Sequence, residues 1–409
     1  MKTWLQGMVI VAAAAHTAAA TNGFYIVPGF DGQGTVGTSF VYLSSSGNQI
    51  VGRQGPDGPS DNTRTFIYQV GGSYTLLPRI INGIPFSGTG TNADASVLVG
   101  SAEAHISARY TRSTDEVTRL GSMPQYALGR PTAVSDDGRV TVGGYETTTN
   151  TYVGEAFMHT DATGLVGMGY ARPFDFHSVA RDVSSDGSVI VGQSYGGATD
   201  VAFRWTSSTG MQPLPYLDPV QGAVSNATVV SRNGEYIGGY SDIPGVLLNG
   251  TAVLWHENAV IALGSIPGME RDSGVYGVTD SGEAVGWGAN NTTSTPFYWS
   301  ASTGMIHLQA LLQNNGVEIP AGITLLKAYD ISADGRTVLG TARSSSLGTF
   351  VFVAVVPTPA TGVVCGSALL LALRRNRSRV IVTRTRYERL PKDVRYSADG
   401  VLPPRRPIN

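Results

Sequence analysis

Cysteine and charged residues are both scarce in this 409-residue chain. Its single cysteine, Cys365, lies close to the C-terminus, so we expect no disulfide, cysteine-based metal site or cysteine nucleophile in residues 21–356. Charged residues make up only 14% of the chain, which does not fit a disordered, highly charged protein. With 52 glycines and 42% hydrophobic residues, the composition favours many short strands joined by tight turns.

The sequence patterns of common enzyme classes are also missing. The histidines beyond the first 20 residues form no H-E-x-x-H or H-x-H arrangement; they are His105, His159, His177, His256 and His307. The chain therefore shows no zinc motif. No G-x-S-x-G elbow, Walker loop or dinucleotide fingerprint occurs in a suitable context. We predict no catalytic residue, no metal and no cofactor.

Basic residues are under-represented in the central part of the chain. Residues 21–356 hold 16 basic and 27 acidic side chains, whereas residues 374–409 hold 11 basic and 3 acidic ones. Proteins bind the phosphates of nucleic acids through basic surfaces, so the acidic body argues against a nucleic-acid partner. A solvated acidic surface that aids solubility explains the imbalance.

What the chain does contain is seven copies of one pattern, close to Ala-x-x-Val-Ser-x-Asp-Gly-x-x-x-Val-Gly. The turn residue of the pattern falls at Gly47, Ala95, Gly138, Gly187, Gly234, Gly282 and Gly335. The steps between these positions are 48, 43, 49, 47, 48 and 53 residues. A period near 48 with mainly β content is typical of a propeller. We therefore expect an all-β fold, a seven-bladed β-propeller over residues 21–356.

Each copy predicts one four-stranded blade. In the fourth copy, residues 180–184 and 188–192 are expected to pair around the turn Asp186-Gly187, because glycine adopts a positive φ without a clash. Residues 201–205 and 210–214 supply the third and fourth strands. The repeated Asp is predicted to bond to the backbone of its own turn. Calcium binding is disfavoured because one Asp per blade holds the carboxylates far apart.

The two ends of the repeat region are expected to share a blade. The last copy, around Gly335, stops at residue 356 before any fourth strand. Residues 24–27 form an apolar segment ahead of the first copy with nothing to pair with. We predict that this segment completes the seventh blade, which removes an exposed sheet edge.

The third-strand segment of the fourth copy carries a family resemblance. Together with the Ser-x-Asp-Gly and Val-Gly elements, Val201-Ala202-Phe203-Arg204-Trp205 resembles the HAF repeats of bacterial extracellular proteins. The resemblance spans nearly all of residues 21–356 and implies a fold rather than an activity. The second copy departs most, since Asp94-Ala95 replaces Asp-Gly.

The N-terminus has the features of a secretory signal peptide. Lys2 supplies a positive charge, residues 8–15 an apolar stretch, and Ala18 and Ala20 an A-x-A-like cleavage site. Residues 1–20 are therefore expected to direct export and to be removed by signal peptidase. An ordinary buried helix is the alternative interpretation.

A second targeting pattern follows the last repeat. The segment Val356-Pro357-Thr358-Pro359 precedes the uncharged residues 360–373, and Arg374, Arg375 and Arg377 follow. This order resembles the PEP-CTERM sorting signal, which implies processing by an exosortase-like enzyme, although Thr358 stands where that family has glutamate. Residues 360–373 are expected to enter the membrane with the arginines on the cytoplasmic side. They are shorter than the about 20 residues of a spanning helix, and a buried helix is the alternative.

These features divide the chain into four parts. We expect a signal peptide at residues 1–20, the propeller at 21–356, a sorting or transmembrane segment with an apolar helix at 357–377, and a basic tail without regular structure at 378–409. The expected location is the cell surface or the medium.

Loops that join one blade to the next carry the candidate ligand-binding residues. They are Asp175, His177, Asp218, Glu270, Arg271 and Asp272. With the expected strand order, these loops gather around one mouth of the central channel and the Ser-x-Asp-Gly turns lie on the opposite face. Solvated loop charges are the alternative interpretation of the same residues.

Two functions are compatible with this sequence. The first is a non-catalytic scaffold or binding module of the extracellular matrix, with an extracellular polysaccharide as a candidate partner. The 18 tyrosines and 5 tryptophans permit stacking on sugars. The second is a polysaccharide-degrading enzyme, which would need two loop carboxylates about 5–10 Å apart across a cleft.

Overall fold

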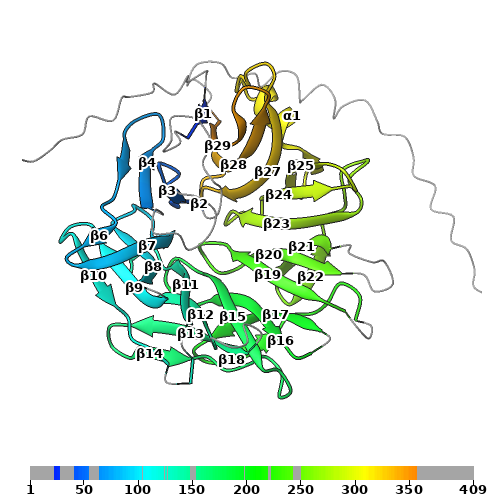
Figure 1. Ribbon diagram of the computed structural model, residues 1–409. Coiled ribbons are helices and arrows are strands. Elements are labelled where there is room, and N and C mark those ends of the chain that lie inside the picture. The colour runs from blue at the N-terminus through cyan, green and yellow to red at the C-terminus, as the bar shows by residue number, and fades with distance from the viewer. Residues whose placement is uncertain are drawn as a thin grey trace, which may run out of the picture. The chain divides into compact units, whose positions relative to one another are not determined.

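The computed structural model describes residues 23–27, 41–54, 64–103, 105–123, 125–126, 128–147, 153–197, 199–219, 223–242 and 250–356. These residues form seven antiparallel sheets that follow one another around a central channel (Figure 1). The predicted seven-bladed, all-β propeller is therefore confirmed. The expected signal peptide at residues 1–20, the sorting segment and the basic tail lie outside the described residues.

Blades 1 to 3 are built from strands β2 to β14. Blade 1 contains β2 (Val41–Leu43), β3 (Gln49–Gln54), β4 (Arg64–Gln69) and β5 (Tyr74–Leu76). Blade 2 contains β6 (Ile80–Ile81), β7 (Ile84–Thr91), β8 (Val97–Ala102), β9 (Ile106–Thr111) and β10 (Glu116–Arg119). Blade 3 contains β11 (Leu128–Val134), β12 (Thr141–Glu146), β13 (Gly154–Thr160) and β14 (Gly164–Gly167). The short β6 is an addition to the four strands predicted for each blade.

Blades 4 to 7 use the remaining strands. Blade 4 contains β15 (His177–Val183), β16 (Ile190–Tyr195), β17 (Asp200–Thr206) and β18 (Gly210–Pro213). Blade 5 contains β19 (Ser225–Val230), β20 (Ile237–Asp242), β21 (Gly250–His256) and β22 (Ala259–Ala262). Blade 6 contains β23 (Asp272–Val278), β24 (Ala284–Ala289), β25 (Ser294–Ser300) and β26 (Gly304–His307). Blade 7 contains β27 (Thr324–Ile331), β28 (Thr337–Ser344), β29 (Gly348–Val355) and β1 (Phe24–Ile26).

Each Ser-x-Asp-Gly segment forms the turn between the first two strands of its blade. In blade 4, Ser184 Oγ donates to Asp186 at 2.8 Å and accepts the Val189 N–H at 3.0 Å, while Asp186 accepts the Ser188 N–H at 3.0 Å. Gly187 has a φ of +75°, a conformation that glycine adopts without strain. The structural role predicted for the repeated Asp is confirmed by these bonds.

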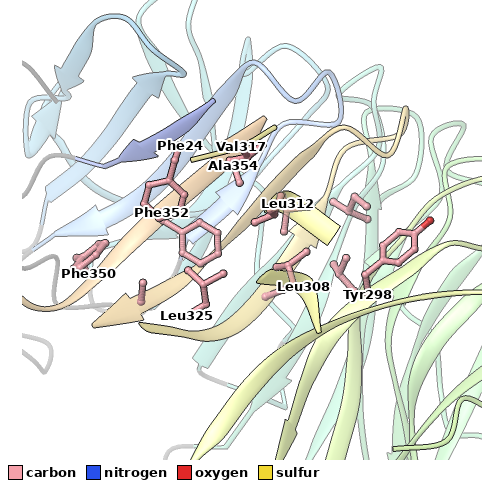
Figure 2. Close-up of a cluster of buried hydrophobic side chains, with 14 residues drawn as sticks. Phe24, Tyr298, Leu308, Leu312, Val317, Leu325, Phe350, Phe352 and Ala354 are labelled. Carbon is pink, nitrogen blue, oxygen red and sulfur yellow. The ribbon is translucent and has the colours of Figure 1, made fainter. Parts of the chain in front are cut away.

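The N-terminal strand closes the ring. β1 pairs with β29 in antiparallel register, with Phe24 opposite Ala354, so the predicted completion of the seventh blade by residues 24–27 is confirmed. The Phe24 ring is fully buried and stacks on Phe352 with ring centroids 5.2 Å apart (Figure 2). The Val27 N–H extends the pairing by donating to the Val351 carbonyl at 3.0 Å.

One helix was not foreseen from the sequence. α1 (Leu308–Asn314) follows β26 and buries Leu308 and Leu312 in the same hydrophobic cluster as Phe24 and Tyr298 (Figure 2). The two leucines are four residues apart and so lie on one helix face. The helix spans only seven residues, too few for its periodicity to stand out in the sequence. No helix in the described part of the chain is long and apolar enough to span a membrane.

Serine side chains hold successive blades together. A serine near the start of the first strand accepts a hydrogen bond from an alanine N–H in the third strand of the preceding blade. The pairs are Ser178 with Ala156, Ser225 with Ala202, and Ser273 with Ala252, each at 2.9 Å. These repeated bonds fix the angle between neighbouring blades 3 to 6 and therefore the width of the channel they surround.

The closure of blade 7 predicts a large effect of a single substitution in β1. Phe24→Ala removes a fully buried ring and should lower the free energy of unfolding by about 3–5 kcal/mol. The matched control is Phe174→Ala, because that ring is 63% exposed and should change stability by less than about 1 kcal/mol. Urea denaturation measures both values. Similar losses for the two variants would contradict the role of β1 in closing the ring.

Candidate ligand-binding site at the channel

The first strands of the blades surround a central cavity of about 460 Å³. Residues of all seven blades line it; they come mainly from the innermost strands β2, β7, β11, β15, β19, β23 and β27 and, in blade 7, also from β28 and β29. Because each innermost strand contributes from the same position of the repeat, the lining can be compared from blade to blade. This comparison separates residues that every blade needs from residues that only some blades carry.

Six of the innermost strands contain a β-bulge at equivalent positions. The bulged residues are Thr89, Thr132, Arg181, Thr228, Tyr276 and Tyr329. A bulge places one extra residue in a strand and redirects its side chain. All but Thr89 contribute to the lining of the cavity, so this position of the repeat supplies one side chain to the channel in each of blades 3 to 7.

Threonine at the bulge joins neighbouring blades. Its hydroxyl donates to a backbone carbonyl on the innermost strand of the next blade. The bonds run from Thr89 to Pro131 at 2.6 Å, from Thr132 to Ala180 at 2.8 Å, and from Thr228 to Val275. In blades 2, 3 and 5 this side chain is therefore structural.

Blades 4, 6 and 7 carry Arg181, Tyr276 and Tyr329 instead of threonine. Among the described residues, none of the three forms the interblade bond that the threonine hydroxyl makes in the other blades. Such a bond contributes about 1 kcal/mol. Positions where a sequence departs from its own structural rule are expected at functional sites. These three residues are therefore the first candidates for binding a ligand.

The two bulge tyrosines belong to an aromatic cluster. We define it as Tyr240, Tyr276, Trp287 and Tyr329, from β20, β23, β24 and β27. Tyr276 stacks on Trp287 with centroids 6.1 Å apart and meets Tyr329 edge-on at 6.3 Å. The Lys327 ammonium lies 3.9 Å above the Trp287 ring, in a cation–π contact. All five side chains are half-buried, so part of each remains accessible.

Three carboxylates lie on the same face as the interblade loops. Asp200 starts β17, Asp242 ends β20 and Asp272 starts β23. Burial raises the pKa of all three, and the negative charge of Asp272 raises the pKa of Asp242 further. Burial lowers the pKa of Lys327, while the nearby Asp272 opposes that shift. Acidic groups and one lysine thus flank the aromatic cluster.

Of the six residues predicted from the loops, Asp272 belongs to this arrangement. Asp175 is buried in an ion pair with Arg172, with Nη2 and Oδ1 2.8 Å apart, and also accepts a bond from Ser194 at 2.7 Å. His177 is buried as well, and burial together with the charge of Arg181 lowers its pKa. Within the described residues, His177 Nε2 has no hydrogen-bond partner.

The other predicted loop residues lie apart from the aromatic cluster. Glu270 and Arg271 are exposed; Glu270 accepts the Gly268 N–H at 2.8 Å and Arg271 donates to Asn291. Asp218 is half-buried in the loop after β18. These contacts are local to the loops.

Sequence reasoning missed most of the channel residues because they lie within strands rather than loops. Asp200 and Asp242 sit at strand ends on the face of the interblade loops, and the aromatic residues sit inside strands of blades 5 to 7. One signal was available. Aligning the copies on their turns sets Thr132 and Thr228 against Arg181, Tyr276 and Tyr329, a change from a small hydroxyl residue to large side chains.

Two carboxylates follow bulge residues, and each accepts hydrogen bonds from backbone N–H groups of its own blade and of a neighbouring blade. Asp182 accepts the N–H groups of Val183 at 2.8 Å and of Val230, in the next blade, at 2.9 Å. Asp330 accepts the Ile331 N–H at 2.8 Å, and the Leu43 N–H of blade 1 also stabilises its charge. Burial raises the pKa of Asp182 to about 6 and that of Asp330 to about 7.

The turn-side end of the channel is crossed by side chains. Arg232 of blade 5 forms an ion pair with Asp136 of blade 3, and Ser45 of blade 1 donates to the same carboxylate at 3.1 Å. These three turns belong to blades that are not adjacent, so their contacts bridge the axis. A ligand is therefore expected to enter from the opposite end, where the aromatic cluster lies.

In the described part of the chain, no group of three or more His, Cys, Asp or Glu residues is arranged to hold a metal.

Comparison with known proteins gives a class of fold. No family model and no curated protein matches the sequence. Among solved structures, an oligogalacturonate lyase in complex with manganese is 13% identical, with a TM-score of 0.52 over 79% of this chain and 89% of that chain. TolB from Acinetobacter baumannii is 15% identical, with a TM-score of 0.43 over 63% of this chain and 62% of that chain. At these identities the likeness concerns the fold alone, and the chain is described as a β-propeller module.

Asp330 predicts a pH-dependent stability. Burial raises its pKa in the folded protein to about 7, above the value of about 3.9 in an unfolded chain. The folded state therefore holds this proton more tightly than the unfolded state does. Its contribution to stability is fully present below about pH 4 and is lost as the pH rises to about 7.

Asp330→Asn removes this titration, so its free energy of unfolding relative to the unaltered protein should increase between about pH 4 and pH 7. Urea denaturation at several pH values measures the difference. Asp182→Asn should show a smaller increase that ends near pH 6, following the lower pKa of Asp182. A difference that stays constant across this range would refute the assignment of a raised pKa to Asp330.

Proposed function

We propose that this protein is a non-catalytic carbohydrate-binding propeller of the bacterial cell surface or extracellular matrix. The aromatic cluster at the open end of the channel is the observation that carries the proposal. Half-buried Tyr and Trp rings offer broad apolar faces together with polar edges, and the apolar faces of sugar rings pack against such surfaces. Binding sites of this kind combine aromatic walls with a few well-placed polar groups.

The polar groups beside the rings suit a sugar ligand. The carboxylates of Asp242 and Asp272 accept hydrogen bonds from hydroxyl groups, and the Lys327 ammonium donates to ring or hydroxyl oxygens. Because Lys327 already contacts Trp287, the donor is held next to a stacking surface. Stacking and hydrogen bonding can therefore act on the same sugar unit.

An enzymatic alternative uses the same residues. Asp242 and Asp272 interact electrostatically, and burial raises the pKa of each. Glycoside hydrolysis uses one protonated and one ionised carboxyl group on either side of the scissile bond. We favour binding because the aromatic cluster offers stacking surfaces on several strands. Cleavage of the polysaccharide is a separate outcome of the same experiment.

Calorimetric titration of the full chain with neutral and acidic oligosaccharides tests the proposal. The double variant Tyr276→Ala, Trp287→Ala should weaken binding about tenfold or more, since each ring contributes about 0.5–1.5 kcal/mol beyond its buried area. Tyr236→Ala is the matched control, because that ring stacks on His256 and packs at the turn around Gly282 on the opposite face.

Binding that survives loss of both rings would refute the site. Chromatography of the oligosaccharides after incubation separates the two functions. Shortened products that disappear in Asp272→Asn would favour the enzyme, whereas intact ligands favour a binding module.

We also propose that the chain is exported through residues 1–20 and sorted through Val356, Pro357, Pro359, Arg374, Arg375 and Arg377 by an exosortase-like enzyme. One structural feature is compatible with removal of the tail. The Val356 N–H donates to the Arg336 carbonyl at 2.8 Å, and its own carbonyl accepts from Arg336 at 3.2 Å. Cleavage beyond Pro359 would therefore leave every described strand of blade 7 in place.

Mass spectrometry of terminal peptides from membrane, surface and medium fractions tests this sorting. We expect a mature start at Thr21 and an end close to Pro359 in the surface or medium fraction. A chain that retains Asn409 in the membrane fraction would contradict processing and indicate stable anchoring through residues 360–373.

A further inference from the structure

Arg181 is an unusual cation within the propeller. It occupies the bulge of β15, lines the cavity and is exposed within it. Its hydrogen bond to Gln193 Oε1 is long, at 3.4 Å. Among the described residues it forms no ion pair, whereas Arg172 pairs with Asp175 and Arg232 with Asp136. A guanidinium carries five donors, so most of its bonding capacity is unused.

A second unsatisfied group lies beside it. Asn226 of β19 donates from Nδ2 to the same Gln193 Oε1 that Arg181 contacts. The Asn226 side chain is 7% exposed, and its Oδ1 has no hydrogen-bond partner among the described residues. Buried polar atoms without partners are rare in folded proteins. The Asn226 side chain also interacts with the Tyr240 side chain, so polar groups around Gln193 connect Arg181 to the aromatic cluster.

We propose that the ligand contains sugar acids and that Arg181 binds their carboxylate. The inference rests on the proposed carbohydrate-binding function and specifies its ligand class. The planar guanidinium matches the two oxygens of a carboxylate. Adjacent sugar units of the ligand would then reach Tyr276 and Tyr329, the bulge residues of blades 6 and 7.

The charges around Arg181 make the proposal testable in both directions. Asp200 interacts electrostatically with Arg181, so a ligand carboxylate competes with an existing negative charge. Residues 21–356 are acidic as a whole, so attraction to an acidic sugar must arise locally at Arg181. Removing the charge of Arg181 should therefore weaken binding of acidic sugars, and removing that of Asp200 should strengthen it.

The experiment titrates the full chain with oligomers of galacturonate, glucuronate and mannuronate, each compared with its carboxyl-reduced neutral counterpart. At least one acidic oligomer should bind about tenfold more tightly than its neutral counterpart, the value of a charge-assisted hydrogen bond. Arg181→Gln should abolish this preference, because it weakens binding of the acidic form about tenfold more than binding of the neutral form. Asp200→Asn should strengthen binding of the acidic form several-fold with little effect on the neutral form.

Each outcome separates the two proposals. If acidic and neutral forms bind equally, or if the preference survives in Arg181→Gln, the sugar-acid inference is wrong while the carbohydrate site stands. If no oligomer of either kind binds, or if loss of Tyr276 and Trp287 leaves binding intact, the proposed function fails and the inference fails with it. Thermal melting confirms that Arg181→Gln folds; should it not, an unchanged acidic preference in Asp200→Asn overturns the inference.

Discussion

The pairing of β1 with β29 is the constraint on which the structure depends. Apart from the turn contacts of Asp136 across the axis, the seven sheets pack on their neighbours, and they form a ring only when the first blade and the last are held at the correct angle. A three-residue strand from the N-terminal end supplies that link, with Phe24 opposite Ala354 and stacked on Phe352. Because the innermost strands surround a common cavity, the closure of blade 7 also sets the position of every side chain that lines the channel.

A second constraint acts at the channel itself. The same bulge occurs in six innermost strands, and in blades 3 to 7 its residue lines the channel. Where that residue is threonine, its hydroxyl joins two blades. Where it is arginine or tyrosine, this bond is absent among the described residues and a large polar side chain lines the channel instead. A nearly symmetric scaffold thereby carries an asymmetric site, with Arg181 in blade 4 and the aromatic cluster in blades 5 to 7.

Acidic residues illustrate how one side-chain type serves different ends in this fold. Asp186 stabilises an exposed turn through local bonds, whereas Asp182 and Asp330 line the channel and each bind backbone N–H groups of two blades. Asp175 has the loop position expected of a ligand-binding residue but is buried against Arg172. Burial and partners, rather than residue type or spacing, distinguish these roles.

The sequence by itself determined the period, the number of blades, the order of strands within a blade and the closure by residues 24–27. These follow from local physics, because Asp-Gly turns and apolar strand segments are visible over a few residues. It did not reveal α1, because the only apolar periodicity of this seven-residue helix is the pair of buried leucines Leu308 and Leu312. The channel site was decided only by tertiary structure. Tyr240, Tyr276, Trp287 and Tyr329 come from four strands in three blades. They meet only because blades 5, 6 and 7 pack side by side and the repeated bulge turns Tyr276 and Tyr329 toward the channel.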